Sequence, residues 1–283
     1  MPGFFMKAEI TSWLRPMSAI ALPVLPNRTV DPWNAINPYE LWLMTVLIAV
    51  VSFLGYAAVR LLGANRGVLV SSAAGSLISS TTVTINNAQL ARKGGGRSNG
   101  IFASATCIAW IVSYTRMTAL AVIANFNMLA PLGLTMLAAI SVLIVAAWLF
   151  ARGDGKNKAD AGSIFRNPLD LSFVLKFGAL LGAVTAGVKI AQAEFGSSAV
   201  IGLAGLTGFL DVDPITLSVS RAAQNEEMYR AAAEAILLAA AANMTTKMGA
   251  SIVLGGLKYG LVLVAAGTLS LLAAGAVFLV YGV

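Results

Sequence analysis

Apolar segments of about 20 residues, the length an α-helix needs to cross the hydrocarbon core of a membrane, recur along the whole chain. Two of the segments, residues 67–92 and 197–220, are interrupted by polar residues. The other six are continuous and predict spanning helices at residues 39–62, 100–124, 131–152, 169–192, 228–254 and 257–283. The pattern predicts an all-α polytopic membrane protein with almost no water-soluble part.

The two interrupted segments resemble each other. Residues 75–85 align with residues 207–217 at an offset of 132, which places Thr84 opposite Thr216. The apolar elements around each interruption also follow in the same order, and this indicates an internal duplication. The predicted organisation is an interfacial or loosely ordered lead-in at 1–38, a first membrane repeat at 39–152, a cytoplasmic loop at 153–168 and a second membrane repeat at 169–283.

The distribution of basic residues predicts how the interrupted segments sit in the membrane. Lys and Arg are enriched in short cytoplasmic loops, and here they flank both ends of the first interrupted segment and fill the central loop, at Arg60, Arg66, Arg92, Lys93, Arg97, Arg152, Lys156, Lys158 and Arg166. They share one side only if that segment enters and leaves on the same side. A segment that crosses would instead make the repeats parallel. The distribution therefore favours two re-entrant broken-helix hairpins in an inverted-topology repeat, with both termini outside.

Composition narrows the classes of function. Apolar residues make up 58% of the chain and charged residues 11%, against about 25% charged in soluble domains. The absence of His and the single Cys exclude His/Cys metal sites, intrachain disulfides and His-based acid–base catalysis, and we expect no enzyme. The net charge of +7 comes from residues at the ends of apolar runs, which is typical of membrane orientation, so no nucleic-acid partner is expected.

The polar residues at the first interruption are candidates for solute binding. Ser79, Ser80 and Thr81 stand where a half-helix would begin, and Thr84 follows one turn later. Backbone that leaves a helix at membrane depth must be covered by protein or line a cavity, and transporters aim such half-helices at their solute. Hydroxyl groups there face an anion or simply cap the helix, and both readings stay open.

The second interruption carries carboxylates. Asp213 precedes Pro214 and is predicted to cap the following half-helix, with proline in the first helical position. Asp211 lies two residues earlier and Thr216 one turn later. Because Na⁺ and Mg²⁺ prefer oxygen ligands, Asp211 and Asp213 are also the candidate ligands for a bound cation. No other cofactor is expected.

Three further polar residues lie inside predicted spanning helices. Arg116 and Lys247 occupy nearly the same place in the two repeats, and Asn243 precedes Lys247 by one turn. An ionisable residue within a membrane is a functional-site hypothesis that requires a named partner. We predict Asp211 or Asp213 as the partner of both cations. A purely structural ion pair is the alternative.

Several short runs resemble one family of bacterial proteins. They are residues 14–18, 40–44, 52–56, 79–84 and 208–213. The family is the uncharacterised C-terminal membrane domain that usually follows an MgtC/SapB-type module, and the resemblance covers nearly everything from Leu14 onward without that upstream module. It implies a multi-pass protein of the bacterial inner membrane and supplies no substrate.

Two functional hypotheses follow. The leading one is a transporter or channel for a small ion or solute, bound between the two hairpin tips near the middle of the bilayer. The alternative is a non-transporting membrane partner or regulator linked to MgtC-like magnesium physiology. The expected partners are the lipid bilayer, the small ion or solute and an MgtC-like membrane protein. The sequence leaves open the charge of the solute and whether the chain forms a homo-oligomer.

Overall fold

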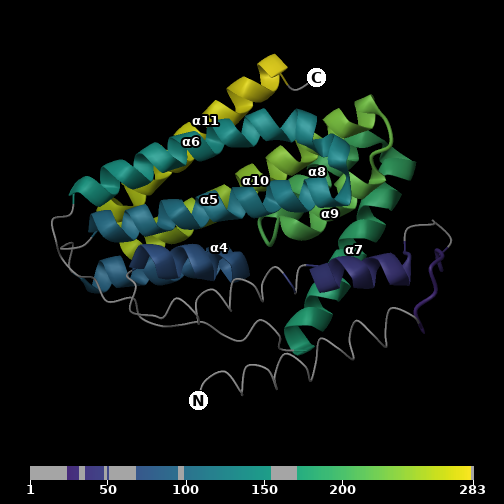
Figure 1. The fold of residues 1–283 in the computed structure, drawn as a ribbon, viewed down its shortest axis with the longest axis horizontal. Helices are drawn as coiled ribbons and strands as arrows, with labels where there is room; N and C mark the ends of the chain where they lie inside the picture. The colour runs from purple at the N-terminus through teal and green to yellow at the C-terminus, as the bar shows by residue number, and fades with distance from the viewer. Residues whose placement is uncertain are drawn as a thin grey trace.

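The computed structural model describes residues 24–31, 36–47, 50, 68–94, 99–153 and 171–281, without the side chains of 171–178 and 197. Within these residues every regular element is helical, so the predicted all-α fold is confirmed (Figure 1). The elements are a helix at 38–47, α4 (Val68–Lys93), α5 (Asn99–Ala124), the 3₁₀ turn η1 (Phe126–Met128), α6 (Leu129–Gly153), α7 (Leu171–Phe195), α8 (Ser197–Gly208), α9 (Asp213–Ala222), α10 (Glu226–Gly255) and α11 (Leu257–Tyr281).

The first interrupted segment, α4, folds back on itself. Ser79 leaves the helical conformation, with φ −158° and ψ 105°. Asn87 Nδ2 donates to Ser72 Oγ at 3.1 Å, although the two residues are 15 positions apart. In a straight helix, fifteen residues would separate them by about 22 Å. The two halves of α4 are therefore the antiparallel legs of a hairpin, as the re-entrant prediction requires.

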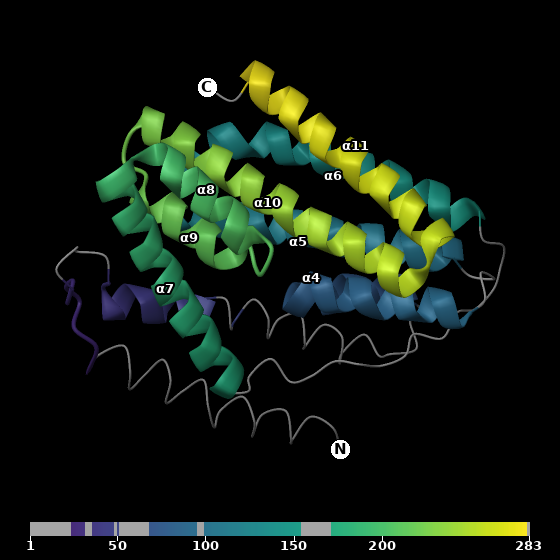
Figure 2. The same cartoon turned by 180° about the vertical axis from the view of Figure 1, so that it is seen from behind.

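The second hairpin consists of α8, a short non-helical connection at 209–212, and α9. It opens at the opposite end of the bundle from α4 (Figure 2). At one end, Arg92 of α4 donates to the carbonyl of Val253, close to the end of α10. At the other end, Asn125, directly after α5, donates to the carbonyl of Ser220 at 3.1 Å. The two hairpins thus enter from opposite ends, which is the inverted-topology arrangement.

Long apolar helices surround the hairpins. By length and composition, five helical stretches of the described chain are able to cross a membrane: α4, α5, η1 with α6, α10 and α11. The α4 segment meets this criterion as one stretch of 26 residues, although its two legs run side by side in a hairpin. The predicted span at 39–62 and the predicted loop at 153–168 extend outside the described residues, and the predicted division into a lead-in and two repeats stays a prediction.

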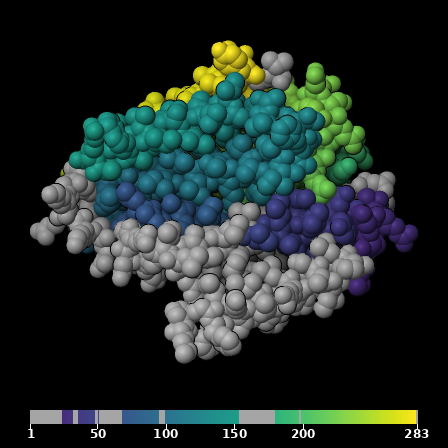
Figure 3. Space-filling view, in the orientation of Figure 1, coloured from purple at the N-terminus to yellow at the C-terminus, as the bar shows by residue number. Residues whose placement is uncertain are grey.

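The distribution of side chains is that of a membrane protein. Large apolar residues are exposed along the outer sides of α6 and α11, among them Leu137, Val145 and Leu272, and the outer side of α6 lies on the face shown in Figure 3. Polar residues are instead buried between the helices, for example Asn87 and Ser251. Intramembrane polar residues face the interior of a bundle because lipid offers them no hydrogen bonds. The chain is a multi-pass membrane protein.

Candidate functional site

Ser79 forms the tip of the first hairpin and caps its second leg. Its extended conformation breaks α4, and its Oγ accepts from the backbone N–H of Thr82 at 3.3 Å and from the Thr82 hydroxyl at 3.0 Å. Serine is a preferred N-cap because its side chain satisfies a backbone N–H that has no partner within the helix. For Ser79 the capping interpretation therefore accounts for the residue. Thr81 lies beside it, partly exposed.

The second tip is organised around two aspartates. The α9 helix begins at Asp213, which is followed by Pro214. The N-cap position is occupied by Val212, whose side chain makes no capping hydrogen bond. The prediction that Asp213 is the N-cap was wrong. The Oδ1 atom of Asp211 accepts from the Asp213 backbone N–H at 3.1 Å instead. Capping by Asp211 leaves the carboxylate of Asp213 available for contacts outside its own helix.

Arg116 of α5 joins the two tips. Its Nη2 lies 2.8 Å from Asp213 Oδ2, and the two side chains are 9% and 3% exposed. Its Nη1 donates to the carbonyl of Leu77 at 3.0 Å, at the end of the first α4 leg. That carbonyl belongs to the negative end of a half-helix dipole, where a cation is favourable. One guanidinium thus bridges hairpins that enter from opposite ends, and the predicted partnership of Arg116 with an aspartate is present.

Lys247 of α10 reaches the place where the two hairpin tips meet, here called the junction, from the other side. It is 2% exposed, and its Nζ donates to Ser113 Oγ at 3.0 Å. Ser80, in the first turn of the second α4 leg, donates to the same Ser113 oxygen at 3.2 Å. Among the described residues no carboxylate forms an ion pair with Lys247, so its predicted pairing with Asp211 or Asp213 is not found.

The remaining predicted residues divide into two kinds. Asn243 is buried and donates to the carbonyl of Gly208, the last residue of α8, at 3.1 Å. Thr84 serves the packing of the hairpin, because its hydroxyl donates to the Ser80 carbonyl at 2.8 Å and accepts from Trp110 Nε1 at 3.0 Å. Thr216, its counterpart in the second repeat, is fully buried, and its hydroxyl has no hydrogen-bond partner in the part of the chain that the structure describes.

The junction encloses a small space. A cavity of about 10 Å³ lies against Lys247 and is lined by Ser113, Tyr114, Met117, Val212, Ala240, Asn243, Met244 and Lys247. This volume is close to what a single water molecule occupies. The sequence-predicted residues Arg116, Asp213, Lys247, Asn243 and Ser80 are thus gathered around one buried point, together with Ser113.

As a cation site, the aspartate pair provides few free ligands. Asp213 Oδ2 is held by Arg116, and Asp211 Oδ1 accepts from backbone. Asp213 Oδ1 is buried and has no hydrogen-bond partner among the described residues. Within the same residues, no three His, Cys, Asp or Glu side chains gather as a metal site would require. Binding of Na⁺ or Mg²⁺ at Asp211 and Asp213 stays a prediction.

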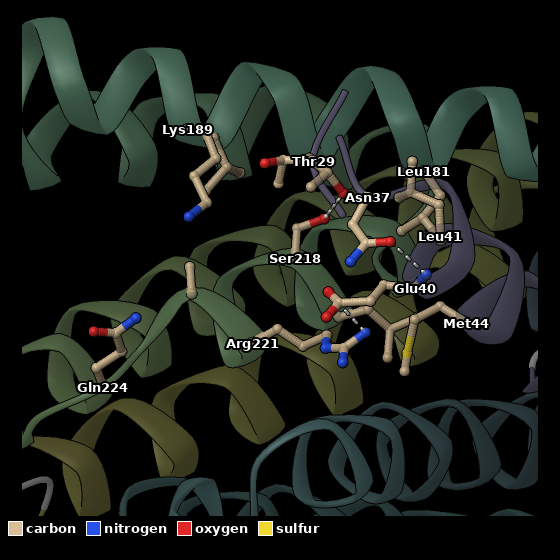
Figure 4. A pocket seen from close by; sticks show the side chains of 14 residues that line it. Thr29, Asn37, Glu40, Leu41, Met44, Leu181, Lys189, Ser218, Arg221 and Gln224 are labelled. Atoms are coloured by element: carbon tan, nitrogen blue, oxygen red, sulfur yellow. Dashed lines mark hydrogen bonds and ion pairs between the residues drawn. The ribbon is translucent and has the colours of Figure 1, made fainter. Parts of the chain in front are cut away.

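A larger pocket lies on the other side of α9 (Figure 4). Its volume is about 330 Å³, within the range of small-molecule sites. Arg221 of α9 lies 3.5 Å from Glu40 of the 38–47 helix, and Lys189 of α7 borders the same space. Its apolar wall consists of Leu41, Met44, Leu181, Val188, Leu217 and Ala222. The sequence analysis did not find this pocket, because its charged residues come from three elements that no motif connects.

Comparisons with known proteins agree with this membrane architecture. The family described as a domain of unknown function (DUF4010) matches residues 46–255, which include both hairpins. The chain belongs to this family. An uncharacterised protein of Aquifex aeolicus (strain VF5) is 30% identical over 193 residues, 67% of this chain and 83% of that protein. No solved structure matches the chain.

Ser113 is the residue at the junction that the sequence analysis missed. It precedes Arg116 by three positions, so the two side chains share one face of α5. That spacing was a usable signal, since a polar residue one turn from an intramembrane arginine is placed to contact the same partners. The backbone carbonyl of Leu77 carries no side-chain signal, and only the folded hairpin shows that it lies against Arg116.

Proposed function

We propose that the protein is a transporter for a small ion or solute, which binds between the two hairpin tips near the middle of the bilayer. One observation carries the proposal: Arg116 contacts the tips of two hairpins that open at opposite ends of the molecule. Each tip is therefore reached from a different side of the membrane. Secondary transporters with inverted repeats place their solute where such broken helices meet, and alternate the side from which it is reached.

Burial of charge at the junction supports the same proposal. Arg116, Asp213 and Lys247 are all removed from water at membrane depth, which is costly for a protein that needs only to span a bilayer. A helix bundle can hold its elements together at a lower cost in free energy, because small residues pack closely without the desolvation of any charged group. We infer that the charges are kept for a solute, and that the pocket of Figure 4 is the vestibule on the side where α9 enters.

The proposed location is the bacterial inner membrane, with the basic end of the molecule in the cytoplasm. The resemblance to domains that follow MgtC/SapB-type modules supports a second candidate function, a membrane partner or regulator that does not transport. In that case the buried charges would be structural, and an MgtC-like membrane protein would bind the outer surface of the helices in stoichiometric amounts.

Charge movement on solid-supported membranes tests transport. Vesicles with purified protein would be exposed to concentration jumps of Na⁺, K⁺, Mg²⁺, protons, halides, phosphate and small carboxylates, with isotope uptake to detect electroneutral transport. We expect a saturable signal for one species. Asp213→Asn should abolish it, whereas Glu234→Gln, on α10 where the 40% exposed Glu234 side chain pairs with Arg230 at 3.4 Å, should leave it unchanged.

Asparagine has the shape of aspartate and still accepts a hydrogen bond from Arg116, so the variant should fold. Its helix content and unfolding midpoint would be compared with those of the unmodified protein. Full transport by folded Asp213→Asn protein would refute the site. Silence of folded unmodified protein in both assays, together with a co-purifying membrane partner, would favour the regulator.

A further inference from the structure

The two repeats are chemically unequal at the junction. The offset of 132 places Asp213 opposite Thr81 and brings Arg116 to within one residue of Lys247. The cation of the first repeat, Arg116, contacts the tip of the second hairpin through Asp213. By the same symmetry the cation of the second repeat, Lys247, faces the tip of the first hairpin, where the matching residue is a neutral threonine. The second ion pair lacks its anion.

Among the described residues, Lys247 has no carboxylate within ion-pair distance. Its ammonium group is buried and donates to the neutral hydroxyl of Ser113. The nearest buried carboxylate, Asp213, already pairs with Arg116, and Asp211 is only partly buried. The buried carboxylate of the junction is therefore in contact with Arg116, and Lys247 has only longer-range interactions with Asp213 and Asp211. A buried charge without a counter-charge is strongly unfavourable, and a bound anion would remove that cost.

Hydrogen-bond donors also outnumber acceptors at this point. Lys247 has three N–H groups and uses one on Ser113, while Asn243 uses one of its two on the Gly208 carbonyl. Ser113 accepts from both Lys247 and Ser80, so its own hydrogen remains to be donated. Asp213 Oδ1 is a buried acceptor left without a partner among the described residues. A cation at that oxygen would lie beside Arg116, so the charge balance favours an anion.

We propose that the junction binds a small inorganic anion of halide size, in the place that a carboxylate at position 81 would occupy by symmetry. Lys247 supplies the charge, and Ser113 and Asn243 supply neutral donors. The adjoining cavity of about 10 Å³ is close to the size of one water molecule, so a single-atom anion comes nearest to its size and any larger solute requires movement of the hairpins. As the identity of a transported solute, this inference rests on the proposed function. Binding itself does not require transport.

The test is anion-dependent stabilisation of purified protein. Sodium gluconate would be replaced stepwise by chloride, bromide, nitrate or phosphate at constant ionic strength, and the thermal unfolding midpoint recorded. We expect a saturable rise with chloride or bromide that is lost in Lys247→Gln. Thr81→Asp should supply the missing carboxylate, unfold at a higher temperature without halide and gain nothing from it. Thr81→Ser, which adds neither charge nor bulk, should keep the halide effect.

Equal halide effects in the unmodified protein, Lys247→Gln and Thr81→Asp would overturn the proposal, as would stabilisation that follows the cation and ignores the anion. If Thr81→Asp fails to fold, Lys247→Gln and the charge-conserving Lys247→Arg decide the question, with halide binding expected only in the latter. Halide binding without uptake would uphold the site and remove the transport proposal. Uptake of a cation without halide binding would uphold the transport proposal and remove the halide site.

Discussion

The bridge made by Arg116 sets a quantitative expectation for stability. Substituting methionine keeps much of the aliphatic length of Arg116 and removes the guanidinium. The two close contacts that disappear are the 2.8 Å ion pair with Asp213 and the 3.0 Å hydrogen bond to the Leu77 carbonyl, and a longer bond to the Ile78 carbonyl at 3.5 Å is lost with them. The Asp213 carboxylate is only 3% exposed, so Arg116→Met leaves a negative charge in the protein interior without its ion-pair partner.

The cost follows from these two losses. Removing one member of a buried ion pair costs about 3–5 kcal/mol, chiefly because the other charge stays buried and unpaired. Leaving the Leu77 carbonyl without its donor costs about another 1 kcal/mol. We therefore expect Arg116→Met to lower the free energy of unfolding by about 4–6 kcal/mol. Adding Asp213→Asn to the same chain removes the unpaired charge and should restore about 2–3 kcal/mol.

A double-mutant cycle in mixed micelles measures these quantities. Protein in a mild detergent is unfolded by increasing the mole fraction of dodecyl sulfate, and helix content is followed by circular dichroism. Arg230→Met is the matched control, because the Arg230 side chain is 58% exposed and its ion pair with Glu234 lies on the surface. It should change the unfolding free energy by less than about 1 kcal/mol.

Either of two results would refute the reasoning about the bridge. One is an unfolding free energy of Arg116→Met within about 1 kcal/mol of that of the unmodified protein, because breaking a buried ion pair should cost more than this. The other is strict additivity of Arg116→Met and Asp213→Asn, because two residues in contact should show a coupling energy of about 2 kcal/mol. Both would mean that the hairpin tips are held by packing alone.

Three further predictions concern the hairpins. Cysteines in place of Ser72 and Asn87, in a chain without the native cysteine, should be joined by a short bifunctional thiol reagent, which a straight helix would prevent; failure of reaction in folded protein would contradict the hairpin. Gly208→Ala should destabilise by about 3 kcal/mol or more, because a Cβ there overlaps the backbone of α10, whereas Gly202→Ala meets nothing within 4 Å and should be neutral in the same unfolding assay. Ser79→Ala should lower the unfolding free energy by about 1 kcal/mol through loss of the cap, and an unchanged midpoint would count against that role.

The broken elements were predictable because their cause is local. Runs of apolar residues long enough to span a membrane are interrupted by hydroxyls at residues 79–82 and by the aspartates around Pro214, and such residues favour helix starts over helix interiors. The side of entry followed from the basic residues at both ends of the first segment. The choice of Asp213 as the N-cap failed, because Asp211 accepts the hydrogen bond from the Asp213 backbone N–H at the second tip. Residue type alone did not distinguish two aspartates so close together.

The partners of the buried charges needed more than sequence. Arg116 and Lys247 were recognisable as a matched pair of intramembrane cations. Because an ionisable residue within a membrane needs a partner, an aspartate was the expected partner of each. The structure pairs Arg116 with Asp213 and gives Lys247 a serine. Which cation receives the carboxylate depends on how the hairpins cross α5 and α10, a matter of angles and distances that residue spacing along one helix does not fix.

The sequence by itself determined that the chain lies in a membrane, where its helices break, and that the breaks are duplicated, because hydrophobic length, helix-start chemistry and repetition are written in the order of residues. The tertiary structure alone decided that the two tips meet, that one arginine joins them, and that Lys247 donates to a serine hydroxyl. Contacts between residues more than 30 positions apart arise from the packing of whole helices. The geometry of these contacts depends on both hairpins entering from opposite ends and packing against the same two helices, α5 and α10.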